Sequence, residues 1–182
     1  DTAPSDQLGL ASVGTGGKGS SDIINASVNG RERIISLCDV DSSGSNKISR
    51  VTKKFPNASF YDNFKMMLDK EKDIDAITIS SPDHTHASAA VYAMERDIHV
   101  YVQKPLTHNI YEARLLTKMA RDKKIVSQMG NQGASNPDQL QIQKWVNDSS
   151  IGAISKVQVW TNRPVWPQGG KMPLPNSSSK PE

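Results

Sequence analysis

The chain has 182 residues, of which 36% are hydrophobic, 23% charged and 5% aromatic, and its formal net charge is +3. These values are typical of a globular protein with one full domain and room for the start of another. The small, dispersed charge and the few aromatic residues argue against a nucleic-acid-binding surface, and no apolar run approaches the roughly 18 residues of a membrane span. We therefore expect neither nucleic acid nor membrane as a partner. The single cysteine, Cys38, excludes an internal disulfide and is expected to be a small buried hydrophobic residue.

The first predicted strand, 8–13, leads directly into the glycine-rich segment Gly14-Thr15-Gly16-Gly17-Lys18-Gly19. The pattern G-x-G-x-x-G between a strand and a helix is typical of a dinucleotide-binding turn. Gly14 allows the tight bend, Gly16 lets the backbone approach a pyrophosphate, and Gly19 lets the helix pack closely on the strand. The start of the helix then presents backbone N–H groups and partial positive charge to the phosphates.

A carboxylate follows the second predicted strand, 33–38. Asp39 lies twenty residues after Gly19, where its side chain can accept hydrogen bonds from the ribose of adenosine. Asp41 adds a second negative charge that would repel a 2′-phosphate, so the sequence favours NAD over NADP. The alternative interpretation is an ordinary flexible glycine turn, with Asp39 capping the next loop.

Strands and helices alternate along most of the remaining chain. Later strands are predicted at 58–61, 74–80, 98–102 and 124–129, and the near-continuous apolar run at 33–38 is typical of a strand covered on both faces. Apolar residues recur at helical spacing between the strands, and Asp62 and Thr107 are placed to cap two of these helices. The alternation predicts an α/β fold built on a doubly wound parallel sheet.

The pattern changes toward residue 150. Asn136-Pro137 is typical of a helix N-cap followed by proline at the first helical position, and Ile142, Trp145 and Val146 are expected to form the buried face of that helix. Residues 154–161 alternate polar and apolar side chains, which predicts a half-exposed strand unlike those before it.

This change in the character of the predicted strands indicates a domain boundary near residue 150. We expect an NAD-binding domain at 1–150 and the start of a second α/β domain, cut short, at 151–182. Residues 163–182 contain five prolines and no periodicity, which predicts a loop or a truncated connection.

Ligands of open parallel sheets bind at the carboxyl ends of the strands, so the loops there supply the candidate site residues. Lys104 is the candidate catalytic residue, because a lysine at a strand end, braced by the following proline, can approach the nicotinamide and a substrate hydroxyl and relay a proton. The candidate cofactor-binding residues are Gly14, Thr15, Gly16, Gly17, Lys18, Gly19, Asp39, Ser81, Pro82, His86, Gln103, Lys104 and Asn131.

A metal site is not expected. His84-Thr85-His86 could be a pair of metal ligands, but it lies where a helix begins, and no cysteine or third histidine is close in the sequence. Asp83 is instead expected to act as a cap and to shape the turn with His84, while His86 lies near the nicotinamide ribose.

Several of these segments, taken in order, resemble the N-terminal domain of the Gfo/Idh/MocA (glucose-fructose oxidoreductase, inositol dehydrogenase) family. The resemblance covers about residues 6–170. The segments that carry it are 13–19, Cys38-Asp39-Val40-Asp41, 73–79 followed by Ser80-Ser81-Pro82-Asp83-His84-Thr85-His86, 99–106 and 129–133.

The resemblance implies a Rossmann-type domain followed by an α/β domain with a large open sheet, NAD(P)-dependent redox chemistry on a sugar or cyclitol, and homo-oligomers assembled through that sheet. It places Lys104 in the family's Glu-Lys-Pro motif, where the lysine helps position cofactor and substrate. Gln103 stands where the family has Glu, and it carries no charge to hold Lys104 protonated. The family's other acid and base residues, an Asp and a His, are expected in the second domain, outside this chain.

The segment Arg163-Pro164-Val165-Trp166-Pro167-Gln168 resembles the stretch that enters the substrate region in one subgroup of the family. Members of that subgroup are often exported. Because the chain begins Asp1-Thr2-Ala3-Pro4 without methionine, a periplasmic location after signal removal is favoured, with the cytoplasm as the alternative.

Three functions stay open at this point. The first is an oxidoreductase that moves a hydride between NAD and a carbon bearing a sugar hydroxyl. The second is an NAD-dependent glycoside hydrolase of the same family, which uses transient oxidation to weaken the glycosidic bond. The third is a non-catalytic NAD-binding module. Release of NADH with a free sugar indicates the first, and release of an aglycone without net NADH the second.

Overall fold

The computed structural model describes residues 3, 6–41 and 46–162. The chain forms two units, residues 1–131 and residues 132–182, and each is described here by itself. The division predicted after residue 150 stays a prediction. The segment 163–168, with its resemblance to a substrate-region stretch, lies outside the described residues.

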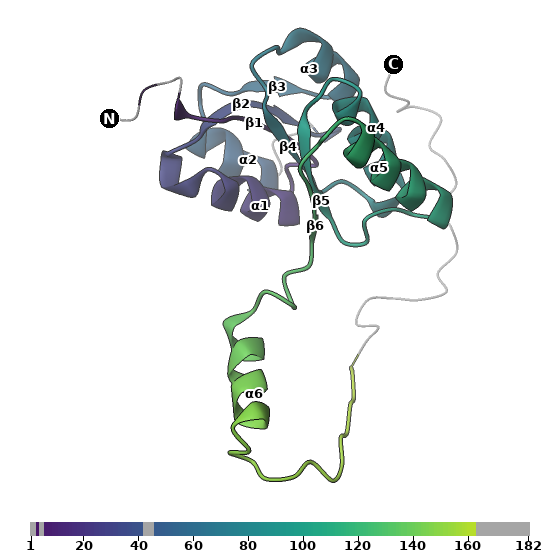
Figure 1. Cartoon of the computed structure of the whole chain (residues 1–182). Coiled ribbons are helices and arrows are strands. Elements are labelled where there is room, and N and C mark those ends of the chain that lie inside the picture. Colours follow the sequence, from purple (N-terminus) through teal and green to yellow (C-terminus); the bar gives the residue numbers. More distant parts are fainter. Residues whose placement is uncertain (1–2, 4–5, 42–45, 163–182) are drawn as a thin grey trace, which may run out of the picture. The chain divides into compact units, whose positions relative to one another are not determined.

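Six strands form one sheet in the first unit (Figure 1), in the order β3-β2-β1-β4-β5-β6, and all of them pair in parallel. The chain winds outward from β1 to β3 and then returns to the other side of β1 to wind out to β6. This is the doubly wound α/β sheet that the sequence predicts. The strands are β1 (Gly9–Val13), β2 (Arg33–Cys38), β3 (Ser59–Tyr61), β4 (Ala76–Ile79), β5 (His99–Gln103) and β6 (Ser127–Gly130).

The last strand begins later than predicted. Residues 124–129 were the expected range, but Lys124 has a φ of 56°, which no strand residue adopts. The amide of Ile125 donates instead to the carbonyl of Ala120 at 2.9 Å. Lys124 and Ile125 therefore close the preceding helix, and β6 starts only at Ser127.

Helices cover both faces of the sheet (Figure 1). Leu10, Ile23, Leu37 and Val51 form one apolar cluster on the side of α1 and α2. The other cluster lies on the side of α3, α4 and α5 and includes Ala11 and Val13 of β1, because successive strand residues point to opposite faces. The helices are α1 (Lys18–Ala26), α2 (Asn46–Lys54), α3 (Phe64–Lys70), α4 (His86–Met94) and α5 (Ile110–Asp122), with short 3₁₀ turns at η2 (Val28–Gly30) and η3 (Asp83–Thr85).

Two predicted helix caps are wrong by one or two residues. Asn63, not Asp62, caps α3, since its Oδ1 accepts from the amides of Lys65 at 2.9 Å and Met66 at 3.4 Å. Asn109 caps α5 by accepting from the amide of Glu112 at 2.9 Å, while the Thr107 hydroxyl donates to the Asn109 carbonyl. A side chain caps a helix only from the position next to its first turn, and neighbouring polar residues compete for that position.

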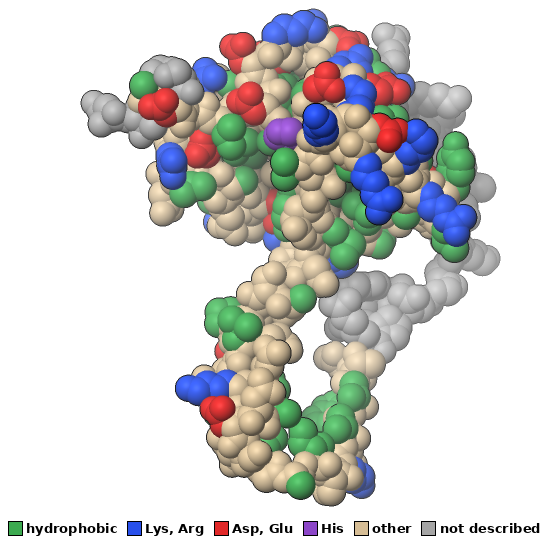
Figure 2. Space-filling view, in the orientation of Figure 1, with side chains coloured by type: hydrophobic (Ala, Val, Ile, Leu, Met, Phe, Trp, Pro, Cys, Tyr) green, Lys and Arg blue, Asp and Glu red, His purple; other side chains and the backbone are tan. Residues whose placement is uncertain are grey.

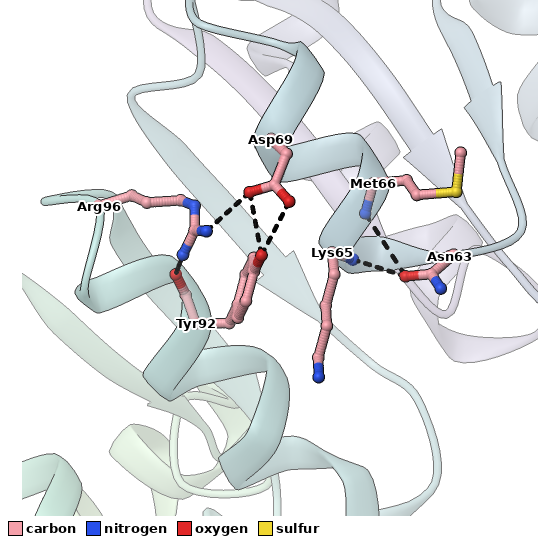
Figure 3. Close-up of polar contacts among 6 residues, drawn as sticks. All are labelled: Asn63, Lys65, Met66, Asp69, Tyr92 and Arg96. Atoms are coloured by element: carbon pink, nitrogen blue, oxygen red, sulfur yellow. Dashed lines mark hydrogen bonds and ion pairs between the residues drawn. The ribbon is translucent and has the colours of Figure 1, made fainter.

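A polar cluster joins α3 to α4 (Figure 3). The Tyr92 hydroxyl lies 2.9 Å from both carboxylate oxygens of Asp69, and Arg96 donates to Asp69 at 2.6 Å. The Arg96 guanidinium also lies over the Tyr92 ring, 3.5 Å from its centroid. The hydrogen bonds from Tyr92 and Arg96 lower the pKa of the Asp69 carboxyl. Tyr92 meets the Phe64 ring edge-on with 5.9 Å between centroids, so the cluster also supports Phe64 at the start of α3.

Charged side chains of both signs are interspersed on the visible face of the first unit (Figure 2). The longest helix among the described residues, α5, has 13 residues. None of the described helices combines the length and the apolar character needed to cross a bilayer.

The second unit contains α6 (Pro137–Asn147), and its start is the predicted one. Asn136 is the N-cap, with its side chain accepting from the amide of Asp138 at 3.0 Å, and Pro137 is the first helical residue. The predicted buried face is wrong, because Ile142, Trp145 and Val146 are 48%, 47% and 40% exposed. The described part of this unit offers no second helix or strand for them to pack against.

The strand predicted at 154–161 is also absent from the described residues. These residues adopt no regular structure, and Val159 is 91% exposed. Alternation of polar and apolar side chains would put the apolar ones on one face of a strand. A strand forms, however, only when a neighbouring strand pairs with its backbone. Hydrophobic side chains consequently remain on the surface of this unit (Figure 2).

Candidate functional site

A pocket of about 620 Å³ opens at the carboxyl ends of β1, β2 and β4. Strand β1 lies between β2 and β4, where the winding of the chain reverses, and ligands of open α/β sheets bind at this switch point. The volume lies within the range of small-molecule sites. The pocket is lined by Val13, Gly14, Gly16, Gly17, Cys38, Asp39, Val40, Asp41, Ile48, Asp62, Phe64, Ser80, Ser81, Pro82, His84, Thr85 and Ala89.

Two glycines of the first loop are required by close packing. Gly14 has a φ of 77°, and a Cβ there would lie 2.4 Å from the amide nitrogen of Ser81. A Cβ on Gly19 would lie 1.7 Å from the carbonyl oxygen of Gly14. Gly14 therefore makes the bend and Gly19 the contact between α1 and β1, as the sequence predicts.

The other two glycines border the pocket. A Cβ on Gly17 would meet nothing within 4 Å, and one on Gly16 would be in ordinary contact with the Asp39 carboxylate at 3.5 Å and with Ile48 at 4.0 Å. Gly17 is also the N-cap of α1, and it has no side chain to accept from the first amides of that helix. The loop thus turns bare backbone, at the positive end of a helix, toward an open volume. A diphosphate fits such a cradle.

Asp39 holds the glycine loop against the end of β2. Its Oδ2 accepts from the amide of Gly16 at 2.9 Å, and its Oδ1 accepts from the amide of Asp41 at 3.1 Å. Each carboxylate oxygen can accept a second hydrogen bond. Because Asp39 also lines the pocket, its remaining lone pairs are in a position to accept from ribose hydroxyls.

Cys38 forms part of the pocket wall as a neutral group. It is 3% exposed, as expected for a small buried hydrophobic residue. Burial, followed by the negative charges of Asp39 and Asp62, raises the pKa of its thiol to about 12. The thiol therefore stays protonated and unreactive at physiological pH.

The loop after β4 is held by side chains inside it. The Thr85 hydroxyl lies 2.7 Å from both the Ser81 hydroxyl and the Pro82 carbonyl. No side chain caps α4, so the cap expected from Asp83 is wrong. Asp83 is the first residue of η3, and Thr85 holds the position next to the first turn of α4. Ser81, Pro82 and Thr85 line the pocket.

His86 joins two loops from a buried position. It is 1% exposed, and its two ring nitrogens lie 2.8 Å from the carbonyl oxygens of Ser81 and Pro105. Both partners only accept, and a neutral imidazole can donate to one of them. His86 therefore ties the β4 loop to the β5 loop and does not line the pocket, whereas His84 does. Across the described residues, no three His, Cys, Asp or Glu side chains gather as a metal-ligand set.

The remaining candidate residues lie outside the pocket lining. Thr15 is fully buried and its hydroxyl has no partner. Lys18 pairs with Asp22. Gln103 is 5% exposed at the end of β5, followed by the exposed Lys104, and Asn131 is exposed after β6. The pocket thus brings together Gly14, Gly16, Gly17, Asp39, Ser81 and Pro82.

Sequence reasoning missed residues after β3 and inside α1 and α2. Asp62 and Phe64 line the pocket. Asp62 directly follows the short strand β3, and Phe64 is the first residue of α3. The rule that selected the other loops applies to this one too, so a signal was available. Asp22 and Ile48 lie within helices, and nothing in their local sequence separates them from ordinary helix residues.

A family model described as an oxidoreductase family with an NAD-binding Rossmann fold matches residues 8–131. That range contains the whole sheet, all the pocket residues and the five helices of the first unit. The chain belongs to this Gfo/Idh/MocA family. Its NAD-binding Rossmann domain contains the sheet and the pocket described above, and NAD is the cofactor of this domain.

Named relatives of this family member are dehydrogenases. The chain is 28% identical over 102 residues to a levoglucosan dehydrogenase of Pseudarthrobacter phenanthrenivorans, which covers 53% of the chain and 26% of the relative. It is 24% identical over 160 residues to an inositol 2-dehydrogenase of Rubrobacter xylanophilus, which covers 86% of the chain and 44% of the relative.

A solved structure agrees in fold. The crystal structure of myo-inositol 2-dehydrogenase from Lactobacillus plantarum matches with a TM-score of 0.68 and 26% sequence identity, over 81% of this chain and 43% of that one. The chain thus spans less than half the length of these relatives.

Proposed function

We propose that this chain supplies the cofactor-binding part of an NAD-dependent oxidoreductase that transfers a hydride between NAD and a hydroxyl-bearing carbon of a sugar or cyclitol. The observation that carries the proposal is the pocket at the switch point, where Gly16 and Gly17 expose backbone and Asp39 presents a carboxylate. The inositol and levoglucosan dehydrogenases among the relatives support the substrate class.

Different residues of the pocket would bind the diphosphate and the adenosine ribose of the cofactor. The glycine loop at the start of α1 would hold the diphosphate, and Asp39 would accept from the hydroxyls of the adenosine ribose. Asp39 and Asp41 together place two negative charges where NADP would bring its 2′-phosphate. We therefore propose NAD, with NADP disfavoured.

Lys104 is the proposed catalytic residue. When bound, NAD supplies the hydride acceptor, so oxidation of a hydroxyl-bearing carbon also releases the hydroxyl proton. The exposed Lys104 follows the carboxyl end of β5, next to β4 in the sheet. From this end of the sheet its Nζ can donate to the substrate oxygen or take part in moving that proton. Further acid and base groups would come from outside this chain.

Cofactor titration tests the proposal on this chain directly. We expect NADH, followed by its own fluorescence, to bind at least about tenfold more tightly than NADPH, a difference of about 1.4 kcal/mol. Absence of NADH binding, or tighter binding of NADPH, would refute it. With the full-length protein, reduction of NAD in the presence of inositols or free sugars tests the reaction. Release of an aglycone without net NADH would indicate the glycoside hydrolase instead.

A further inference from the structure

A buried carboxylate joins three elements beside the pocket. Asp22 lies within α1 and is 7% exposed. Its Oδ2 accepts from the Ser80 hydroxyl at 2.8 Å and from the Gln103 side-chain amide at 2.9 Å. Its Oδ1 pairs with the Lys18 ammonium. Ser80 follows β4 and Gln103 ends β5, so Asp22 connects the glycine-loop helix to the ends of two strands.

All partners of this carboxylate are donors. A buried carboxylate costs free energy unless hydrogen bonds and an opposite charge replace its lost water. Ser80 and Gln103 supply neutral donors, and the half-exposed Lys18 supplies the charge. The Gln103 amide is therefore one of the three donors that replace the water lost by the Asp22 carboxylate.

Gln103 donates with one end and accepts with the other. While its Nε2 donates to Asp22, its Oε1 accepts from the backbone amide of Lys104 at 3.2 Å. A glutamate of the same length accepts at both ends and would face Asp22 with a second negative charge. An apolar residue would do neither. The amide satisfies both neighbours while uncharged, whereas a glutamate could donate to Asp22 only by taking up a proton.

We propose that Asp22 is a positioning residue, which acts through Gln103 to hold the backbone at Lys104. The importance of Lys104 in this statement rests on the proposed function. On this view Gln103 does not mark a weakened Glu-Lys-Pro motif. A carboxylate at position 22 needs a donor at position 103, and the side-chain amide of Gln103 supplies it.

The pair predicts that Gln103→Glu is tolerated only when Asp22→Asn accompanies it. Gln103→Glu sets two buried carboxylates against each other. Asp22→Asn with Gln103→Glu restores one donor and one acceptor, and the Ser80 hydroxyl can turn to accept from the new amide. Asp22→Asn alone keeps an oxygen that accepts from Gln103. Gln128→Glu, on the exposed edge strand β6, is the matched control for the added charge.

Hydrogen exchange at the Lys104 amide measures the positioning without any cofactor. In this chain we expect Gln103→Glu to speed that exchange by about tenfold, from the usual coupling of contacting residues, and the double variant to return it to within about threefold of wild type. Gln128→Glu should leave it unchanged. If Gln103→Glu does not fold, recovery of a folded protein by the added Asp22→Asn tests the same coupling.

Equal exchange in wild type and folded Gln103→Glu, or effects of the two substitutions that simply add, would overturn the proposal. NADH titration of the same variants separates it from the proposed function. If wild type fails to bind NADH while the exchange pattern holds, the proposed function fails and the coupling of Asp22 to Gln103 stands. If NADH binds and the double variant shows no rescue, the proposed function stands and the coupling of Asp22 to Gln103 fails.

Discussion

Replacing Gly19 by alanine would place a methyl carbon 1.7 Å from the carbonyl oxygen of Gly14. An ordinary contact begins near 3.4 Å, so α1 would have to move away from β1 by about 1.7 Å, the difference between the two. The oxygen belongs to the backbone of the bend and cannot turn aside as a flexible side chain can. The movement would also pull Asp22 away from Ser80 and Gln103.

Overpacking of a well-packed contact costs about 1–3 kcal/mol, and this one also disturbs a buried carboxylate. We therefore expect Gly19→Ala to lower the free energy of unfolding by about 3 kcal/mol, which corresponds to roughly 6–12 °C in Tm for a chain of this size. Gly17→Ala is the matched comparison. It meets no atom within 4 Å, so only its backbone conformation, φ 54° and ψ −114°, opposes the methyl group, at about 1–3 kcal/mol.

The two variants should affect different properties: Gly19→Ala mainly the stability, and Gly17→Ala mainly the affinity for NADH. Stability is measured by urea unfolding, followed by far-ultraviolet circular dichroism, because the first unit holds the sheet and most of the helices. Tryptophan fluorescence is unsuitable, since the three tryptophans all lie after residue 131. Gly19→Ala should lose more stability than Gly17→Ala. Gly17→Ala should fold but bind NADH at least about tenfold more weakly, because its methyl group points into the open volume of the diphosphate cradle. A stable Gly19→Ala protein, or a Gly17→Ala protein with unchanged NADH affinity, would refute the division of roles.

Three further predictions concern charged and ionisable groups. Asp39→Ala should weaken NADH binding by about tenfold and reduce the preference over NADPH, measured by fluorescence titration. An unchanged preference would contradict the role of Asp39, and Asp122→Ala on α5 is the control. Cys38 should react with thiol reagents at pH 8 only in the unfolded protein. Its folded pKa of about 12 lies above the ordinary value of 9.0, so stability is present below pH 9 and lost between pH 9 and 12, by up to about 1.4 kcal/mol per pH unit. Cys38→Ala should lack this loss, and an equal loss in both proteins would contradict it. The lowered pKa of Asp69 acts in the opposite direction, because its stabilising bonds are present above the ordinary pKa of 3.8 and lost as the pH falls through the folded value. The Tm decrease caused by Asp69→Asn should therefore be largest at pH 7 and become smaller as the pH falls below 3.8, and an equal decrease at every pH would exclude this explanation.

The sequence predicted those parts of the fold that depend on neighbouring residues. Apolar runs and helical spacing located all six strands and the helices between them, because burial imposes a period on the local sequence. The glycine loop was equally legible, since only glycine tolerates the bend at Gly14 and the contact at Gly19. Asn136-Pro137 marked the start of α6 for the same local reason.

Local signals failed where two side chains compete or where a partner is missing. Asp62 and Asn63 can both cap a helix, and Asn63 is the cap because α3 begins at the next residue. Ile142 and Trp145 have the spacing of a buried face, but no described element of their unit covers them. Residues 154–161 have the alternation of a strand without a strand to pair with.

The sequence by itself determined the order of elements, the glycine loop and the carboxylate after the second strand. Only the tertiary structure decided that Asp22 meets Gln103 across 81 positions of the chain, that His86 joins two loops instead of lining the pocket, and that Phe64 forms part of its wall. The physical reason is that these contacts depend on which strands lie side by side. That order follows from how the sheet is wound, and it leaves no mark on the spacing of residues along the chain.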